Sequence, residues 1–250
     1  MADTVNGFVR RLKAHAAAQR RFIDDAAHQL RTPLALQASQ IEFARYTRKH
    51  RADWPTRRAD MDRMWAELQA SNRRLTAVTN QLLLLAQAEH RDASMRLEPI
   101  DLAPAALRCV EQLAALADRR RIDLGMDLRA QEGEATVRAQ PVLLEALVSN
   151  LLDNALRYTP EGGRVTVGVQ GGAEGPQLWV EDDGPGIAPE DRERVFERFH
   201  RVSQATEGSG LGLAIVREIA DAFGATIELG DAQHGPGGLR ATVRFPPAAG

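Results

Sequence analysis

The chain has 250 residues, of which 44% are hydrophobic and 26% charged, and its 32 basic and 34 acidic side chains give a net charge of −2. This composition is typical of a globular protein of one or two domains, and the small net charge argues against binding to nucleic acid or an anionic membrane through a global field. The only lysines, Lys13 and Lys49, lie in neither a P-loop nor a protein-kinase strand motif, which argues against a P-loop NTPase and an ordinary Ser/Thr/Tyr kinase. The only cysteine, Cys109, favours a reducing compartment.

The first 93 residues have the spacing of two long amphipathic helices. Apolar or small residues recur every three or four positions from Phe8 to Leu30 and again from Met61 to Ala86. The polar segment from Lys49 to Arg58 contains Trp54-Pro55 and predicts the turn between the helices, because proline disfavours helix in the residue before it. We therefore predict an all-α antiparallel helical hairpin that pairs with a second copy into a four-helix bundle. An inert coiled-coil spacer is the alternative.

The pattern changes at Leu97. Met95 to Asp101 is the predicted linker, and no run of roughly 18 apolar residues or signal-peptide pattern predicts a membrane helix or leader. Strands mixed with three helices predict an α+β domain in which one face of a sheet is covered. The predicted helices are Pro104 to Arg121, about 140–158 and 211–223, and the period-two runs are Ile122–Leu128, Val165–Val169, Leu178–Val180, Ile227–Leu229 and Leu239–Phe245.

His28 lies within the first predicted helix, followed by Q-L-R-T-P-L. With Ala26 and Leu30 facing inward, its imidazole points toward solvent. Pro33 cannot donate to the carbonyl of Gln29, so we expect the helix to bend just after the histidine. An imidazole that is largely neutral at cellular pH can be a nucleophile. Taken alone, His28 is better explained as a solvated surface histidine.

Asn150 and Asn154 lie one turn apart on the predicted helix at 140–158, so their carboxamides share a face. A carboxamide oxygen is a neutral ligand suited to Mg²⁺, which prefers few protein ligands together with phosphates and water. Arg157 lies near the same face and could reach a phosphate. The alternative is that the asparagines cap or bridge elements within the domain.

Two glycine-rich turns follow. Asp182 ends a strand and can accept a hydrogen bond from an exocyclic amine, and the D-D-G-P-G-I turn lets a planar ring approach the backbone. The loop from Gly208 to Gly212 opens a helix, whose free amides attract phosphate. Between them, Phe196 and Phe199 precede a polar segment, 202–207, that we interpret as a mobile lid. Each turn by itself also fits a simple structural role.

The motifs, in this order and spacing, resemble the cytoplasmic catalytic core of bacterial two-component sensor histidine kinases, from about Phe22 to Phe245. The resemblance implies a multidomain protein: a dimerisation and histidine phosphotransfer hairpin over residues 1–93, with 1–20 a signal-transmitting linker helix, then a catalytic ATP-binding domain of the gyrase/Hsp90/MutL type over 94–250, a two-layer α+β sandwich. The matching boxes are His28–Leu34, Asn150–Tyr158, Asp182–Gly186, Phe196–Phe199 and Gly208–Gly212.

The resemblance also implies roles for single residues. His28 attacks the γ-phosphate of ATP, the residue at Gln29 orients the imidazole, Thr32 positions water for dephosphorylation of the regulator, and Asn154 binds Mg²⁺. The implied nucleotide contacts are Asn150, Asn154, Arg157, Tyr158, Asp182, Gly184, Gly186, Ile187, Phe199, Gly208, Gly210, Leu211 and Gly212.

Gln29 departs from the family, which often has Glu or Asp there. We expect autophosphorylation to survive but to be slower than with an acidic residue at position 29. A non-catalytic or phosphatase-biased adaptor is the alternative. An ATP hydrolase is disfavoured because Asn150 cannot act as a base where such enzymes place a glutamate. The expected partners are a second copy, a cognate response regulator and ATP, without nucleic acid. We expect this chain to be the cytoplasmic portion of an inner-membrane sensor anchored outside the segment.

Overall fold

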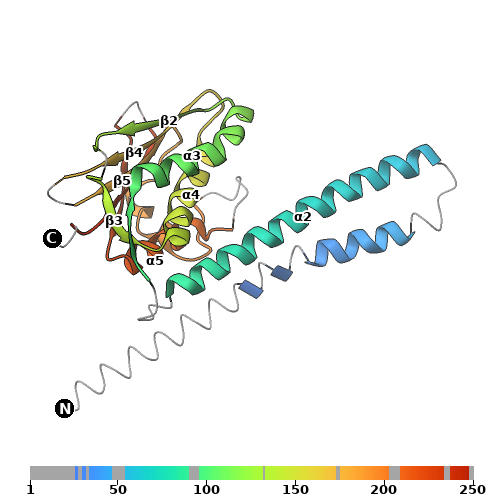
Figure 1. Cartoon of the computed structure of the whole chain (residues 1–250). Helices are drawn as coiled ribbons and strands as arrows, with labels where there is room; N and C mark the ends of the chain where they lie inside the picture. The colour runs from blue at the N-terminus through green and yellow to red at the C-terminus, as the bar shows by residue number, and fades with distance from the viewer. Residues whose placement is uncertain are drawn as a thin grey trace, which may run out of the picture. The chain divides into compact units, whose positions relative to one another are not determined.

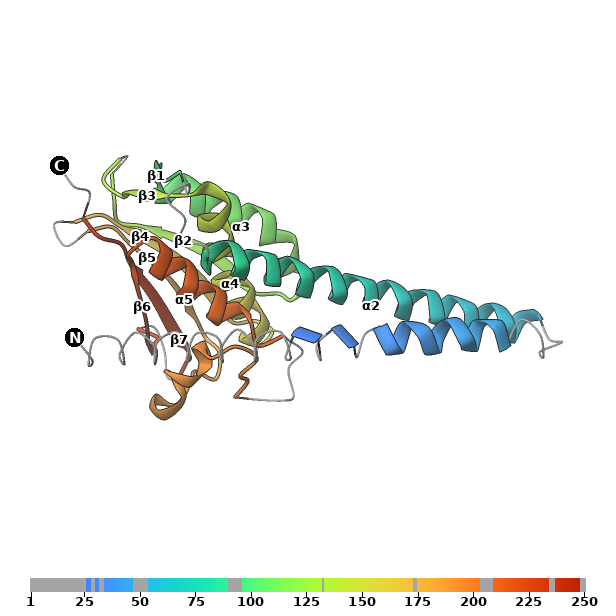
Figure 2. The same ribbon diagram turned by 90° about the horizontal axis from the view of Figure 1, so that it is seen from below.

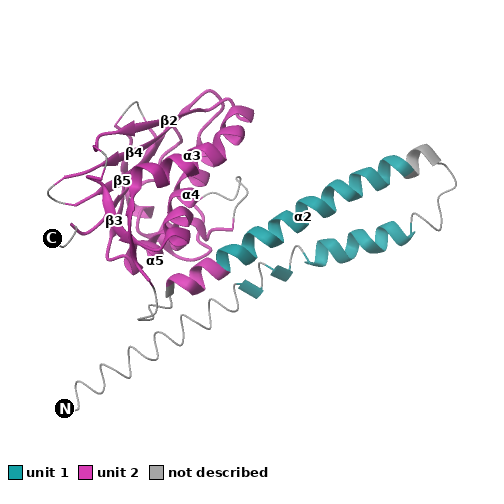
Figure 3. Cartoon of the chain, in the orientation of Figure 1, with its two compact units in different colours: residues 1–82 teal, residues 83–250 magenta. Residues whose placement is uncertain are grey.

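The computed structural model describes residues 26–27, 30–31, 34–46, 54–89, 96–131, 133–172, 175–202, 209–233 and 237–247. The chain divides into two compact units, residues 1–82 and 83–250, which are described separately below (Figure 3). Among the described residues, no helix is both long and apolar enough to cross a membrane.

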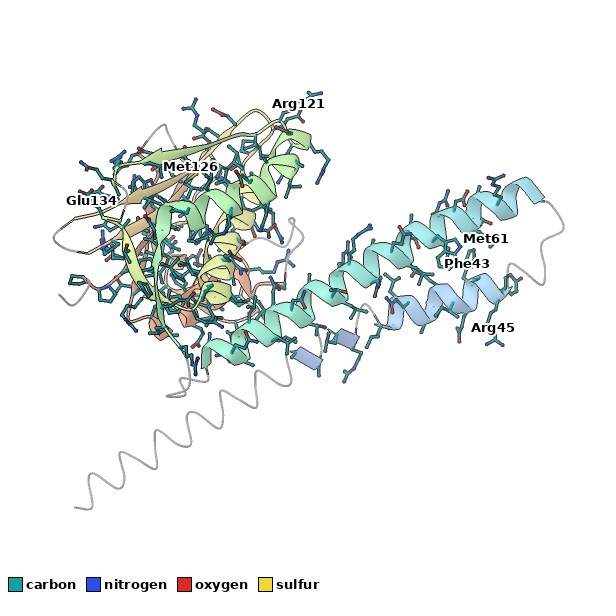
Figure 4. All side chains as sticks on the ribbon, viewed as in Figure 1. Phe43, Arg45, Met61, Arg121, Met126 and Glu134 are labelled. Atoms are coloured by element: carbon teal, nitrogen blue, oxygen red, sulfur yellow. The ribbon has the colours of Figure 1, made fainter. Side chains whose placement is uncertain are left out.

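The first unit is a helical hairpin. Residues 34–46 are helical and lie alongside α2 (Trp54–Glu89) in both views (Figures 1 and 2). The buried Gln40 joins the two helices, since its Nε2 donates to Glu67 Oε2 at 2.9 Å. Figure 4 shows Phe43 and Met61 in the same stretch of the hairpin, as expected for antiparallel helices. The prediction of a helical N-terminal region is confirmed.

The predicted turn from Lys49 to Arg58 is wrong in its second half. α2 begins at Trp54, so the residues from Trp54 to Arg58 are helical, while 47–53 lie outside the described residues. Pro55 falls in the first turn of α2, where its missing N–H would have no intrahelical partner and its fixed φ suits the helix. Proline therefore marks where this helix begins rather than a longer loop.

The second unit is a two-layer sandwich. A five-stranded sheet has the order β2-β4-β5-β7-β6, with β2 parallel to β4 and the remaining neighbours antiparallel. Three helices pack on one face (Figures 1 and 2). The strands are β2 (Asp123–Leu128), β4 (Arg164–Gln170), β5 (Gln177–Asp182), β6 (Thr226–Asp231) and β7 (Leu239–Arg244), and the helices are α3 (Leu102–Arg119), α4 (Pro141–Tyr158) and α5 (Gly212–Ala222). The α+β prediction is confirmed, with each predicted strand and helix present.

The predicted linker from Met95 to Asp101 is partly wrong. β1 (Glu98–Asp101) forms an antiparallel two-stranded ribbon with β3 (Thr136–Ala139). Pro99 is compatible with this ribbon because a strand with a free edge need not use every N–H. Asp101 then caps α3 by accepting from Ala103 N at 3.0 Å. The predicted domain boundary after residue 93 stays a prediction.

Alternation in the strands builds the core under α4. Val165, Val167 and Val169 of β4 have no exposed surface and face the helices, as do Leu147 and Leu152 of α4. Burying such side chains stabilises the fold by about 1.5–3 kcal/mol each. α4 packs between α3 and α5, and the Arg120 guanidinium donates to Leu156 O at its carboxyl end. The central helix, which carries four of the predicted site residues (Asn150, Asn154, Arg157 and Tyr158), is therefore held on both sides and at its carboxyl end.

Candidate functional site

The two carboxamides on α4 meet the first turn of α5. Asn150 Nδ2 donates to Ala146 O at 2.7 Å, which leaves its Oδ1 on the side of α5. A Cβ atom on Gly212 would lie 3.1 Å from Asn154 Nδ2 and 3.4 Å from Asn150 Oδ1. Glycine at this position therefore lets the start of α5 approach both carboxamides. The structure brings together two motifs that lie almost 60 residues apart in the sequence, at Asn154 and Gly212.

The second part of the site is the turn after β5. Asp182 is buried, and Gly184 N donates to its Oδ1 at 2.8 Å. Burial raises the pKa of Asp182 to about 6, against the lowering effect of hydrogen bonds from the backbone N–H groups of Gly184 and Leu239. A Cβ on Gly184 would lie 2.6 Å from Asp182 Oδ1 and 3.2 Å from Tyr158 O, so α4 ends against this turn. A buried carboxylate beside a glycine-rich turn is suited to accept a hydrogen bond from a planar base.

Phe199 and Gly210 join the two ends of the segment that precedes α5. Phe199 has a φ of +62° and Gly210 a φ of +72°. Phe199 N donates to Gly210 O at 2.9 Å, and a Cβ on Gly210 would lie 2.7 Å from Phe199 C. Leu211 is fully buried, and its N–H donates to Ser209 Oγ at 3.2 Å. These contacts fix the backbone immediately before α5.

The segment that carries Phe199 is also attached to α5 through side chains. Arg198 Nη2 lies 2.9 Å from Glu218 Oε1, and the Arg217 guanidinium stacks 3.9 Å from the centre of the Phe196 ring. Phe196 is the last residue of the short helix η2 (Arg194–Phe196), which comes after η1 (Pro189–Asp191). The predicted aromatic motif therefore packs against the second half of α5 through Arg217 and Glu218.

Three further predicted residues lie at the end of α4 and just after the Asp182 turn. Arg157 Nη2 is 2.5 Å from Asp153 Oδ2, one turn earlier on α4, so a predicted phosphate contact by Arg157 would share its charge with this carboxylate. Tyr158 is 40% exposed at the end of α4. The carbonyl of Ile187 accepts from Arg192 Nε at 3.0 Å.

The predicted residues His28, Gln29, Thr32 and Gly208 lie outside the described residues. Their roles therefore stay predictions.

The residues present fit a nucleotide with its magnesium ion. The described part of the chain contains no group of three His, Cys, Asp or Glu residues able to hold a metal by themselves. Two neutral carboxamides against a glycine at a helix start instead offer oxygen ligands together with free amides, an arrangement in which phosphates supply the remaining ligands.

Sequence reasoning missed the connection between β6 and β7. A Cβ on Gly238 would lie 2.1 Å from Asp182 O, and one on Gly186 would lie 3.0 Å from Gly238 O. Leu239 pairs with Asp182 across the sheet and its N–H donates to that side chain. The Gly237-Gly238 pair just before a strand was the available signal, although sequence alone does not say which turn it approaches.

Comparisons with known proteins cover both units. The family model for the His Kinase A (phospho-acceptor) domain matches residues 18–91, and that for histidine kinase-, DNA gyrase B- and HSP90-like ATPases matches 139–249. The sensor protein QseC of Salmonella typhi is 36% identical over 246 residues, which cover 98% of this chain and 51% of QseC. The chain spans about half the length of the curated relatives it matches.

Solved structures of histidine kinases are also similar to this chain. The mycobacterial sensor histidine kinase MprB is 33% identical with a TM-score of 0.52, over 60% of this chain and 97% of MprB. The histidine kinase AdeS of Acinetobacter baumannii shares the fold, with 22% identity and a TM-score of 0.68 over 89% of this chain and 98% of AdeS.

Proposed function

This chain belongs to the sensor histidine kinase family, and from that premise we propose that it transfers the γ-phosphate of ATP to His28 and then to an aspartate of a response regulator. The observation that carries this proposal is the meeting of Asn150, Asn154 and Gly212 beside the Asp182 turn, in a chain that matches both a phospho-acceptor and an ATPase family model.

In the proposed site, the described residues bind and orient the nucleotide. The Asp182 carboxylate accepts a hydrogen bond from the exocyclic amine of adenine, and the amides at the start of α5 donate to phosphate oxygens. The Asn154 oxygen, with Asn150 one turn before it, would hold Mg²⁺. The ion, when bound, would supply positive charge to neutralise the transferred phosphoryl group.

In the proposed chemical step, a residue of the hairpin, His28, receives the phosphoryl group. The lone pair of the neutral His28 imidazole forms an N–P bond to the γ-phosphorus as the bond from that phosphorus to the bridging oxygen breaks, and ADP leaves. The Gln29 amide oxygen can accept a hydrogen bond from Nδ1–H, which would hold the reactive tautomer, but it cannot take up a net proton. Phosphoryl transfer depends mostly on positioning and charge neutralisation, so the step remains feasible without a carboxylate at position 29.

The proposed partners follow from the hairpin and the family. The hairpin leaves large apolar side chains exposed, as expected if a second copy covers them in a four-helix bundle; they include Leu36, Ile41, Phe43, Met61 and Trp65. A response regulator receives the phosphate, and with Thr32 placing a water, the same protein also dephosphorylates that regulator. We place the chain on the cytoplasmic side of the membrane, as part of a sensor anchored outside this segment.

A phosphatase-biased or non-catalytic adaptor is the second candidate, and Gln29 is the observation that favours it. An adaptor would bind nucleotide through the same α4 and α5 residues but leave His28 unphosphorylated.

Incubation of the full chain with γ-labelled ATP and Mg²⁺ tests the proposal. We expect label on the protein that is acid-labile and base-stable, as for phosphohistidine, and that is absent from His28→Ala. ATP binding by His28→Ala should match that of the wild type, since every residue proposed to bind the nucleotide belongs to the second unit. Wild-type protein that binds ATP but takes up no label would favour the adaptor.

A further inference from the structure

Glu181 and Asp182 are neighbours on β5 whose side chains lie on opposite faces of the sheet. Asp182 pairs with Leu239 and Glu181 with Arg240 in the register between β5 and β7. Side chains alternate along β5, so Asp182 and Val180 lie on the face that the helices cover. Glu181 and Trp179 lie on the other face. Both carboxylates are nevertheless buried, with 6% of each residue exposed.

Glu181 uses both of its oxygens to hold the strand and loop that follow Asp231. Its Oε1 accepts from the backbone N–H of Gln233 at 3.0 Å, and its Oε2 lies 3.1 Å from Arg240 Nη1. Gln233 lies at the start of the β6–β7 connection and Arg240 just after its end. A single carboxylate therefore clamps both ends of this connection.

The surroundings of Arg240 restrict its position further. Its guanidinium stacks 4.5 Å from the centre of the Trp179 ring, and Arg129 lies 5.1 Å from the same ring. The ring in turn covers Gly168, where a Cβ would come within 1.8 Å of Trp179 Cε2. The face of the sheet away from the helices thus carries a packed support for the pair of Glu181 and Arg240.

Gly238, at the end of the β6–β7 connection, and Leu239, the first residue of β7, lie against the proposed base site. Gly238 lies directly against Asp182 O, and the Leu239 N–H donates to the Asp182 side chain. On the other side of the turn, the Arg192 guanidinium binds both Asp231 and the carbonyl of Ile187. A shift of this connection would therefore move a hydrogen-bond donor to Asp182 and the backbone that the turn packs against.

We propose that Glu181, acting from the opposite face of the sheet through Arg240 and Gln233, is a positioning residue that holds the β6–β7 connection in place and so fixes the Asp182 carboxylate for recognition of the adenine amine. The inference rests on the proposed function, in which Asp182 accepts from that amine. It adds a specificity determinant that makes no contact with the nucleotide.

The test measures binding of two nucleotides to the full chain with Mg²⁺: ATP, and purine riboside triphosphate, which lacks the amine. Glu181→Gln keeps an acceptor oxygen for Gln233 N–H but loses the charge that holds Arg240. We expect ATP affinity to fall about five- to tenfold, because the charge-assisted hydrogen bond from the adenine amine to a displaced Asp182 is lost. Affinity for the amine-free nucleotide should change less than about twofold. The preference for ATP should therefore shrink, and further in Glu181→Ala, with phosphorylation at saturating ATP within about twofold of wild type.

Glu228→Gln is the matched control, because Glu228 pairs with Arg244 on the same sheet without contacting the Asp182 turn in any described interaction. We expect it to leave both affinities unchanged, and thermal melting shows whether each variant folds. Equal weakening of both nucleotides in Glu181→Gln, or full retention of the ATP preference, overturns the inference alone. A wild-type chain that binds no adenine nucleotide overturns the proposed function and this inference with it.

Discussion

The hairpin and the sandwich bury their apolar side chains to very different extents. In the sandwich, the helix-facing residues of β4, β5 and α4 have almost no exposed surface. In the hairpin, Phe43 is 48% exposed and Trp65 55% exposed, although both belong to long amphipathic helices. The comparison indicates that the described residues of the sandwich bury their own core, whereas those of the hairpin display apolar side chains, which we propose that a second copy covers.

A pair of substitutions tests this contrast with the largest expected effect. Leu152→Ala empties a fully buried position on α4 and should lower the free energy of unfolding of the sandwich by about 2–5 kcal/mol. Trp65→Ala should leave that unfolding transition unchanged and instead weaken self-association, because its indole is already exposed in the single chain. Denaturant melts and sedimentation velocity measure the two effects. A sandwich destabilised by Trp65→Ala, or self-association that is insensitive to it, would contradict the contrast.

The second prediction separates two activities within the hairpin. Thr32→Ala should reduce dephosphorylation of the regulator at least about tenfold while His28 phosphorylation persists, since a hydroxyl that places water is not needed for attack on ATP. Thr32→Ser, which retains the hydroxyl, is the control and should keep most of the phosphatase activity. The measurement follows loss of labelled phosphate from the regulator after ATP is removed. Equal rates with Thr32→Ala and wild type would refute the role.

The sandwich could be predicted from sequence far better than its short ribbon. Alternation in β4 and β7 is strong because one face packs against helices, and the predicted strands match within about a residue or two. β1 escaped prediction because four residues that include Pro99 carry too little periodicity. Trp54-Pro55 misled in the opposite way, since proline also suits a first helical turn.

The site divides in the same manner. Asn150 and Asn154 were predictable as neighbours because helical spacing is local, and glycine-rich turns mark where a ligand can approach. The approach of Gly238 to Asp182 was not predictable, because it depends on the register between β5 and β7. The same register places Glu181 beside Arg240. Contacts between residues far apart in the sequence therefore depend on strand pairing, which the spacing of motifs does not predict.

A pH titration extends the comparison to the ligand site, with an effect of about tenfold per pH unit. The pKa of Asp182 is about 6, so its ionised form accepts from the adenine amine above that pH, and ATP affinity should fall as the pH drops below 6. Folding responds with the opposite sign. Because burial raises this pKa from 3.8, the native state binds more protons than the unfolded chain between those values, and the contribution of Asp182 to stability increases as the pH falls.

Asp182→Asn provides the control for that titration, since its side chain does not ionise. Its ATP affinity should be weaker at pH 8 and nearly constant down to pH 5.5, as measured by equilibrium binding with melting temperature recorded in parallel. A wild-type affinity that is flat across pH 6, or an equally steep decline in Asp182→Asn, would assign the dependence to another group.

The smallest expected effect concerns the residue that follows the phosphorylated histidine. Gln29→Glu should raise the rate of autophosphorylation several-fold, because a carboxylate both holds the Nδ1 proton and stabilises positive charge on the imidazole as the N–P bond forms, whereas an amide oxygen does only the first. ATP affinity should stay unchanged, since the residues proposed to bind the nucleotide all belong to the sandwich, so the gain should lie in the rate at saturating ATP. Gln29→Leu, with neither property, should be slower than wild type. A rate that is unchanged or lower in Gln29→Glu would mean that orientation by the amide already suffices, and that a carboxylate at this position is not what limits the hairpin.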